Sequence, residues 1–195
     1  MELYNGLPLF DLDVVDDMNG VEIISLVDRP AVEREFVAFS QDERFRFSIK
    51  DEEKRIVNGV ALIPDQKIYR RAEDGTEFYV QFSRDAIERI AQKFFADHNS
   101  TNVNLEHQVE VDGCVYFESY LLDSKRGICP TEFSDCPDGT WIVSAKINND
   151  KVWELVKQGV LRGFSIEGNL HIEPSHSKAL DTVEEFMDWL KKQTK

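Results

Sequence analysis

Ser165 is the residue of this sequence whose setting first suggests chemistry. It lies in LRGFSIEGNLHIE, residues 161–173, a segment that predicts a strand but carries Gly163 and Gly168 on either side of the serine. Glycine weakens a strand and leaves room for another backbone to approach. A serine there could act as a nucleophile, which requires a base within hydrogen-bond reach, a group that orients the base and donors for the oxyanion.

His107 is the candidate base among four histidines. The segment VNLEHQVE, residues 103–110, predicts a strand in which His107 shares a face with apolar residues, so its imidazole needs a partner. His98 falls at a polar helix end, and His171 and His176 lie in the tail of the last strand and in the loop after it. Taken alone, a half-buried histidine satisfied by a backbone carbonyl and a strand serine filling a tight space are the commoner explanations of the pair.

The sequence excludes several other catalytic designs. A nucleophile elbow needs glycine two positions after the serine, where this chain has Glu167, and it needs a following helix rather than a strand. There is no HExxH motif for zinc and no glycine-rich phosphate loop. We therefore expect neither a metal nor a cofactor.

The composition of the chain indicates which binding partners and which cellular compartment to expect. The chain has 195 residues, enough for one domain, and a formal charge of -14, which makes nucleic acid and anionic membranes poor partners. Its three cysteines, Cys114, Cys129 and Cys136, show no closely spaced metal-binding pair and suit a reducing compartment. The acidic N-terminus resembles no signal or transit peptide, and we expect an intracellular protein without a membrane span.

The elements that must position these residues follow from periodicity and turn signals. The pattern predicts an α+β fold with most strands antiparallel and a few helices packed outside, and it includes an amphipathic C-terminal helix. Ser83 and Asn149 or Asn148 are the expected helix N-caps. We expect residues 55–64 and 77–83 to pair as neighbours. The remaining predicted strands are 21–28, 103–108, 114–122, 140–147 and 161–173, and the predicted helices are 84–98, 149–159 and 179–192.

Three motifs carry a resemblance to a known family: ISLVDRPAV at 24–32, VNLEH at 103–107 and LRGFSIEG at 161–168. Together they resemble the XkdF-like serine proteases of tailed phages, a branch of the prohead (capsid maturation) proteases that are similar to the herpesvirus assemblins. The resemblance covers roughly residues 20–171 and implies a small, barrel-like β domain with flanking helices. We expect a protease domain over residues 1–178, and the amphipathic pattern of the tail predicts a C-terminal helix over 179–195. The resemblance also implies that Ser165 is the nucleophile and that His107 is the base on the neighbouring strand.

The resemblance leaves more than one candidate for the third catalytic residue. In many prohead proteases an acid just ahead of the SLV strand fills this role, and the corresponding residue here is Glu22. Glu22 lies one residue further from Ser25 than that pattern requires, and Ile23 occupies the matching position. Either a β-bulge brings Glu22 to the site or another group orients the base. The alternatives are a dyad assisted by water, or one of Asp28, Glu118, Glu167 and His171.

The resemblance also implies the oxyanion region and the function. The turn at Arg29 is the nearest counterpart of the assemblin oxyanion stretch, and Arg162 with Gly163 is a rival. The implied function is a serine endopeptidase that cleaves scaffold and major capsid proteins inside the assembling prohead in the host cytoplasm, with the chain itself as a further candidate substrate. The portal and a second copy of the chain are further candidate partners. A catalytically silent scaffold or head-interior protein and a hydrolase of small esters or amides are the alternatives.

Overall fold

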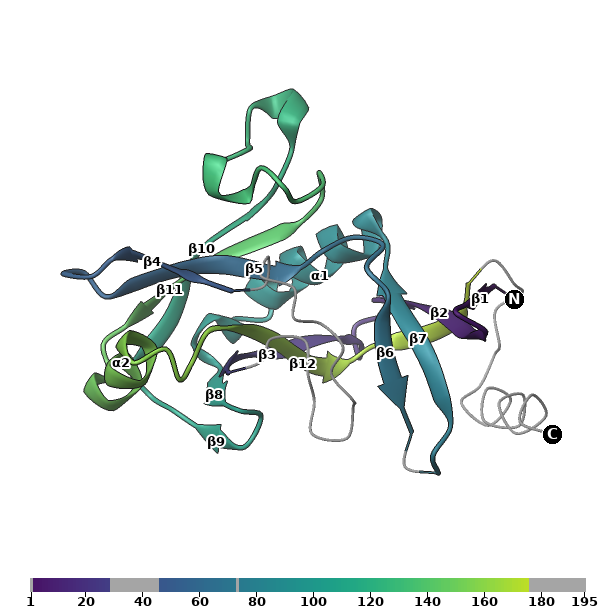
Figure 1. Ribbon diagram of the computed structural model, residues 1–195, viewed down its shortest axis with the longest axis horizontal. Helices are drawn as coiled ribbons and strands as arrows, with labels where there is room; N and C mark the ends of the chain where they lie inside the picture. Colours follow the sequence, from purple (N-terminus) through teal and green to yellow (C-terminus); the bar gives the residue numbers. More distant parts are fainter. Residues whose placement is uncertain (1, 29–45, 73, 176–195) are drawn as a thin grey trace.

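The computed structural model describes residues 2–28, 46–72 and 74–175, and in these ranges the chain is mostly β-sheet with two α-helices (Figure 1). The strands form three open sheets, and none of them closes into a barrel within the described ranges. The α+β class is therefore confirmed, whereas the barrel-like closure that the resemblance implied is not found.

The central sheet has the order β12-β3-β8-β9 and carries the predicted site. Its strands are β12 (Gly163–Asn169), β3 (Gly20–Val27), β8 (Val103–Leu105) and β9 (Val109–Glu110). β3 runs antiparallel to β12 and parallel to β8. Ile24 and Leu26 of β3 are fully buried, and so is Ser25 between them, because neighbouring chain covers both faces of this strand. The prediction that residues 21–28 form a strand beside a site strand is confirmed.

The second sheet has the order β10-β11-β5-β4 and is antiparallel throughout. Its strands are β10 (Cys114–Leu121), β11 (Trp141–Ile147), β5 (Ile56–Leu62) and β4 (Ser48–Asp51). Trp141 of β11 is fully buried and stacks edge-to-face on Phe94 of the first helix at a centroid distance of 5.8 Å. Such aromatic contacts fix the helix against the sheet.

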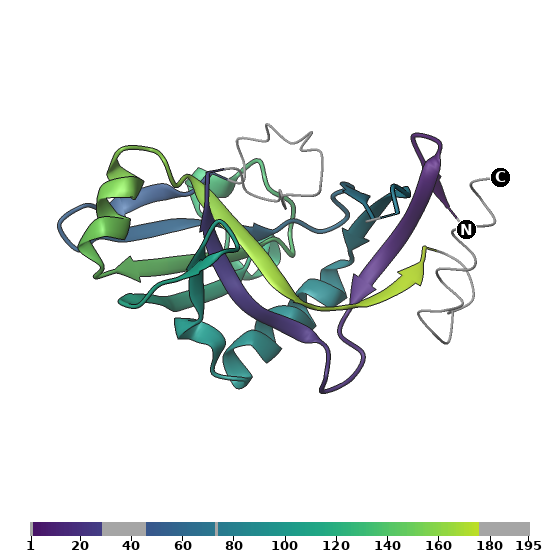
Figure 2. The same ribbon diagram turned by 90° about the horizontal axis from the view of Figure 1, so that it is seen from below.

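The third sheet joins the N-terminus to the end of the described chain. Its path is β1-β2-β7-β6, and a fifth strand, β13, pairs with β2 on the side away from β7. Figure 2 shows β12 running beside β3 and the chain then continuing into β13 beside β2. The strand predicted over 161–173 is thus two strands in two sheets. The bounds are β1 (Leu3–Tyr4), β2 (Leu7–Asp13), β6 (Ile68–Arg71), β7 (Glu77–Phe82) and β13 (His171–Pro174).

Two α-helices pack against these sheets. α1 (Arg84–Ala96) begins at Ser83, whose side chain accepts a hydrogen bond from the Ala86 amide, as predicted. Its apolar face packs on β3, β2 and β11. α2 (Asp150–Lys157) begins at Asn149, whose side chain caps Lys151 and Val152. The chain also forms the short 3₁₀ helices η2 (Asn99–Thr101), η3 (Ser124–Arg126) and η4 (Thr131–Phe133).

One prediction about the fold is wrong, and others concern residues outside the described ranges. The expected pairing of 55–64 with 77–83 is wrong, because β5 and β7 lie in different sheets and β6, from the intervening segment, is the hairpin partner of β7. The C-terminal helix over 179–195 and the residues around Arg29 lie outside the described residues.

Candidate active site

The candidate site lies on one face of the central sheet, where β12, β3 and β8 run side by side. Ser165 of β12 is the direct cross-strand partner of Ser25 on β3, and Ser25 is in turn the partner of Asn104 on β8. Direct partners in a sheet share a face, and residues two apart on one strand do as well. Glu167 therefore shares the face of Ser165, and polar residues from three strands meet there.

One carboxylate oxygen lies within hydrogen-bond distance of several of these polar groups. Glu167 Oε1 lies 2.6 Å from Ser25 Oγ, 2.6 Å from Asn104 Nδ2 and 2.8 Å from His107 Nδ1. Ser25 Oγ is also 3.1 Å from His107 Nδ1. Ser25 and Asn104 are buried, so their hydrogen bonds to the carboxylate are shielded from water. We call Glu167, His107, Ser25 and Asn104 the histidine cluster.

His107 reaches Glu167 from a turn and not from the strand that the sequence predicted. β8 ends at Leu105, and Glu106 and His107 both have left-handed backbone conformations, with φ of 52° and 57°. The turn is tied to the end of β3, because the Glu106 amide donates to the Leu26 carbonyl at 3.1 Å. Left-handed conformations are uncommon for residues other than glycine, and a pair of them next to a polar cluster indicates a position that its surroundings enforce.

The electrostatics of the cluster fix the histidine tautomer. Burial raises the pKa of the Glu167 carboxyl, but hydrogen bonds from Ser25, Asn104 and His107 outweigh it and hold that pKa below its usual range. An ionised carboxylate accepts the Nδ1 proton of a neutral imidazole, which leaves Nε2 without a proton. His107 Nε2 is buried and has no hydrogen-bond partner within the described chain. The ring is therefore held with its basic nitrogen available.

Ser165 lies beside the histidine cluster without joining it. Its strand and β8 are separated by β3, so the prediction that the serine and histidine strands are adjacent is wrong. No hydrogen bond links Ser165 to His107 in the ranges that the structure describes, and their approach within hydrogen-bond reach stays a prediction. Ser165 is only 6% exposed, but it lines a cavity of 290 Å³, which fully buried Ser25 does not. Of the two serines, Ser165 is the one that contributes to the wall of a described cavity.

The structure has a β-bulge at Glu22, but the bulge does not bring Glu22 to His107. The carboxylate that contacts His107 is that of Glu167. In the pairing of β3 with β12, Ile23 lies opposite Glu167 and Val21 lies opposite Gly168, so Glu22 is the extra residue. The Glu22 side chain is exposed and makes no hydrogen bond to His107 among the described contacts. In the family pattern the acid would stand at the position of Ile23. In this structure Ile23 is the direct cross-strand partner of Glu167, which is the acid that contacts His107.

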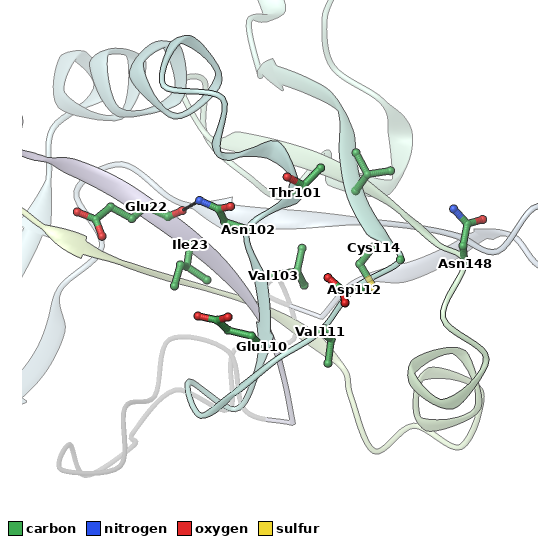
Figure 3. Close-up of a pocket in the computed structure, with 12 residues that line it drawn as sticks. Glu22, Ile23, Thr101, Asn102, Val103, Glu110, Val111, Asp112, Cys114 and Asn148 are labelled. Carbon is green, nitrogen blue, oxygen red and sulfur yellow. Dashed lines mark hydrogen bonds between the residues drawn. The ribbon is translucent and has the colours of Figure 1, made fainter.

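Glu22 lines a different cavity, of 870 Å³, between β3, β8 and the start of β10 (Figure 3). Figure 3 shows its carboxylate pointing away from Val103 and Cys114, which also line this cavity. Glu110 and Asp112 also line it, so the wall is acidic. Burial raises the pKa of the Cys114 thiol to about 11, which keeps the thiol protonated and poorly nucleophilic near neutral pH.

The remaining predicted site residues lie away from the histidine cluster. Arg162 donates from Nε to the Gly159 carbonyl at 2.7 Å and forms an ion pair with Asp28 at 3.1 Å. Gly163 forms an isolated bridge with Arg46, and Arg29 lies outside the described residues. Glu118 lies in the second sheet and His171 in β13 of the third. These placements leave the oxyanion donors a prediction.

Ser25 and Asn104 were missed as site residues, although a sequence signal for the cluster existed. Ser165 and Glu167 are two apart in a predicted strand, which places them on one face. What could not be read from one sequence was that Ser25 and Asn104 lie opposite them in register, because cross-strand register is a property of the folded sheet.

A histidine held through Nδ1 by a carboxylate is the arrangement of base and orienting acid that serine hydrolases use. The sequence model of the family described as "Putative phage serine protease XkdF" matches residues 44–173, more than half of the chain, and the chain belongs to this family. The matched range contains His107, Ser165 and Glu167 but not Ser25.

The chain is also similar to a curated protein that carries the name of this family. The chain is 24% identical over 164 residues to the phage-like element PBSX protein XkdF of Bacillus subtilis (strain 168). The match covers 78% of this chain and 53% of the relative, so the chain spans about half the length of that protein. No solved structure gives a significant match.

Metal sites and membrane-spanning helices were both sought among the described residues. The described residues hold no group of three or more His, Cys, Asp or Glu side chains that could bind a metal ion. Over the same residues, neither helix is long and apolar enough to cross a membrane.

Proposed function

We propose that this protein is a prohead serine endopeptidase in which Ser165 is the nucleophile, His107 the base and Glu167 the residue that orients the base. One observation carries the proposal: Glu167, which shares a sheet face with Ser165, holds His107 Nδ1 at 2.8 Å, and the buried Nε2 has no hydrogen-bond partner in the described chain. A structural protein gains nothing from an unsatisfied buried imidazole nitrogen, which costs free energy.

The reaction is acyl transfer in two halves. His107 Nε2 takes the Ser165 hydroxyl proton as Oγ bonds to the peptide carbonyl carbon, and it returns that proton to the leaving amine as the C–N bond breaks. Water then attacks the acyl ester with the same base, which releases the carboxylate and restores the serine. Glu167 stays ionised and stabilises the imidazolium. Ser165 Oγ must approach Nε2 when the peptide binds, because catalytic hydrogen bonds are often long in unliganded enzymes.

The proposed substrates are the scaffold and major capsid proteins of a phage head, with the chain itself as a further one. Membership in a phage serine protease family supports this context. The portal and a second copy of the chain remain candidate partners, and the host cytoplasm, inside the assembling prohead, remains the proposed site of action.

The test is processing of head proteins by matched variants. The protein is expressed with its own scaffold and capsid proteins in cells that lack any other copy, and the cut termini are read by mass spectrometry. We expect the wild-type protein to produce defined new termini and Ser165→Ala to produce none. Ser144→Ala, which changes a buried serine in the second sheet, should process normally if it folds. Full processing by Ser165→Ala would favour the alternative of a catalytically silent scaffold or head-interior protein.

A further inference from the structure

The chain leaves the ladder between β3 and β8 at Glu106, one residue before His107. β8 runs parallel to β3, and the Glu106 amide continues this pairing by donating to the Leu26 carbonyl at 3.1 Å. In a regular parallel ladder the Asp28 amide would next donate to the Glu106 carbonyl. Glu106 instead takes a left-handed conformation, with φ of 52°, and its carbonyl accepts from Gln108 Nε2 at 3.1 Å. The Asp28 amide therefore needs another acceptor.

The Glu106 side chain supplies that acceptor. Its Oε1 lies 2.5 Å from the Asp28 amide nitrogen, so the carboxylate takes the place of the residue's own carbonyl in the ladder. Hydrogen bonds to an ionised carboxylate are shorter and stronger than those between neutral groups. Glu106 is thus bonded to β3 twice, through its amide at Leu26 and through its carboxylate at Asp28.

The bond from the carboxylate determines where the chain goes after β8. Left-handed conformations are unfavourable for residues with a Cβ atom, yet Glu106 and His107 both adopt one. Without the carboxylate, the Asp28 amide would be satisfied only if residue 106 became extended and its carbonyl rejoined the ladder. An extended chain would carry His107 onward along β3 and away from its place 2.8 Å from Glu167.

Asp28 is also tied to the strand that carries Ser165. Arg162 Nε lies 3.1 Å from Asp28 Oδ1, and the Arg162 amide donates to the Val27 carbonyl at 2.8 Å. Arg162 directly precedes β12. Glu106, Asp28 and Arg162 therefore meet at one end of the central sheet, where β8 and β3 end and β12 begins. Their contacts connect the histidine turn to the serine strand across β3.

We infer that Glu106 is a positioning residue of the proposed protease, whose carboxylate holds the left-handed turn that keeps His107 against Glu167. The inference rests on the proposed function and adds a residue to the same site. Glu106 acts through His107 and takes no part in proton transfer, because its carboxylate is bonded to the Asp28 amide. A base displaced by roughly 1 Å can lower a rate by about 10²-fold, so this support matters for the chemistry.

The kinetic test compares Glu106→Ala with Glu106→Gln in cleavage of purified scaffold protein. The glutamine amide oxygen can accept the Asp28 proton, whereas alanine offers no acceptor. We expect Glu106→Ala to lower kcat about 10- to 100-fold and to leave KM within about twofold, because the base is displaced while the substrate contacts remain. Glu106→Gln should keep most of the wild-type kcat.

A matched control removes a similar bond elsewhere. Asp138 accepts from the Ser124 amide at 2.8 Å, in the connection between β10 and β11. Asp138→Ala should therefore reduce thermal stability without changing kcat per folded molecule. Glu106 is exposed, so its substitutions leave no cavity, and thermal unfolding gives the folded fraction of each variant.

A third substitution separates the side chain from the backbone. Glycine adopts left-handed conformations freely but has no side chain to bond the Asp28 amide. If the carboxylate holds the turn, Glu106→Gly should lose kcat as Glu106→Ala does. A Glu106→Gly protein with the wild-type kcat would show that the backbone conformation alone places His107, and it would overturn the inference.

The imidazole itself gives a measurement that needs no substrate. The two ¹⁵N chemical shifts of His107, read through the carbon-bound ring protons, show which nitrogen carries the proton. We expect the Nδ1–H form in the wild-type, Glu106→Gln and Asp138→Ala proteins, because Glu167 accepts that proton. In Glu106→Ala and Glu106→Gly the shifts should move toward the Nε2–H form, which predominates for neutral histidine in water.

The two measurements distinguish failure of this inference from failure of the proposed function. If wild-type protein cleaves scaffold and Glu106→Ala cleaves it at the same rate, the inference is overturned and the protease function stands. If the ¹⁵N shifts change in Glu106→Ala but wild-type protein cleaves nothing, Glu106 holds the histidine as described and the protease function fails. Unchanged ¹⁵N shifts in Glu106→Ala overturn the inference at any rate of cleavage.

Discussion

Two polar clusters in this molecule use nearly the same parts, yet they differ in what they can do. In the central sheet, Ser25 and Asn104 donate to Glu167. In the second sheet, buried Ser144 donates to Glu118, and Asn58 donates to Ser144 at 2.7 Å. Both are buried serines on central strands that hold a carboxylate on a neighbouring strand. A serine, an asparagine and a glutamate in one sheet are therefore no indication of catalysis by themselves.

The difference is the side chain that contacts the carboxylate in each cluster, a lysine in one and a histidine in the other. Glu118 pairs with Lys50 at 3.1 Å, and both side chains are substantially exposed, so their interaction is a surface ion pair. Glu167 pairs with His107, whose side chain is only 15% exposed and whose second nitrogen has no described partner. An imidazole can take up and return a proton near neutral pH, whereas a lysine in water cannot. We call Glu118, Ser144, Asn58 and Lys50 the lysine cluster.

The strongest test of this difference is removal of the imidazole. His107→Ala should lower the rate of head-protein cleavage by as much as Ser165→Ala does, up to roughly 10⁶-fold, because members of one catalytic unit are not additive. The rate is measured by following the loss of intact scaffold over time. His98→Ala, at an exposed position after α1, is the control and should cleave at the wild-type rate. A His107→Ala protein that retains more than a tenth of the activity would remove the histidine cluster from the mechanism.

The next largest effect is the difference in cleavage rate between substitutions of the two carboxylates. Glu167→Gln should reduce cleavage up to about 10⁴-fold, because a neutral amide no longer fixes the tautomer or stabilises the imidazolium. Glu118→Gln should change thermal stability and leave the rate per folded molecule unchanged. Glu22→Gln is a third arm, and it should also leave the rate unchanged, because the Glu22 side chain makes no hydrogen bond to His107 in the described structure. If Glu22→Gln is the variant that loses activity, the orienting role belongs to Glu22.

The third effect is a change in pH dependence when each serine donor is removed. Hydrogen bonds from Ser25 and from Ser144 lower the pKa of Glu167 and of Glu118. Ser25→Ala and Ser144→Ala should therefore raise these two pKa values, which NMR titration of the carboxyl carbons would measure. Only the Ser25 variant should also shift the acid limb of the rate profile to higher pH. A shift caused by Ser144→Ala would show that the second sheet affects the chemistry.

The same pKa directions predict how stability depends on pH. A carboxylate whose folded pKa is depressed stabilises the fold fully above its unfolded pKa, and this contribution is lost as pH falls through the folded value. For Glu167 the ordinary value is 4.5, so the wild-type contribution should be complete above that pH and decline below it. Ser25→Ala should remove part of this contribution at neutral pH, which urea unfolding at pH 7 and pH 4 would measure.

Local patterns were enough to predict most of the elements, because those elements depend on neighbouring residues. The N-caps at Ser83 and Asn149 and the strands over residues 21–28 and 140–147 are examples. The arrangement of the sheets was harder. β5 and β7 were expected to pair, but the short strand β6 between them pairs with β7. The polar residues of that intervening segment did not predict a strand.

The site was predictable only in part, for two physical reasons. His107 was assigned to a strand face by alternation, but the chain turns through left-handed conformations at Glu106 and His107, and no glycine marks that turn. The carboxylate was sought on β3, near Ser25, whereas the one that reaches His107 comes from the opposite strand. Cross-strand register decides which of two facing positions carries an acid, and one sequence does not reveal it.

The smallest expected effect concerns the lysine cluster and completes the comparison. Lys50→Met removes an ion pair whose side chains are 48% and 38% exposed, and exposed pairs contribute about 0–1 kcal/mol. We expect the free energy of unfolding in urea to fall by less than about 1 kcal/mol, and the loss to shrink further in 1 M salt, where exposed charges are screened. Glu118 keeps its hydrogen bond from Ser144, so the buried part of the cluster stays satisfied. A loss of several kcal/mol would mean that Lys50 is held as His107 is, in a shielded contact, and the contrast between the lysine and the histidine would then be wrong.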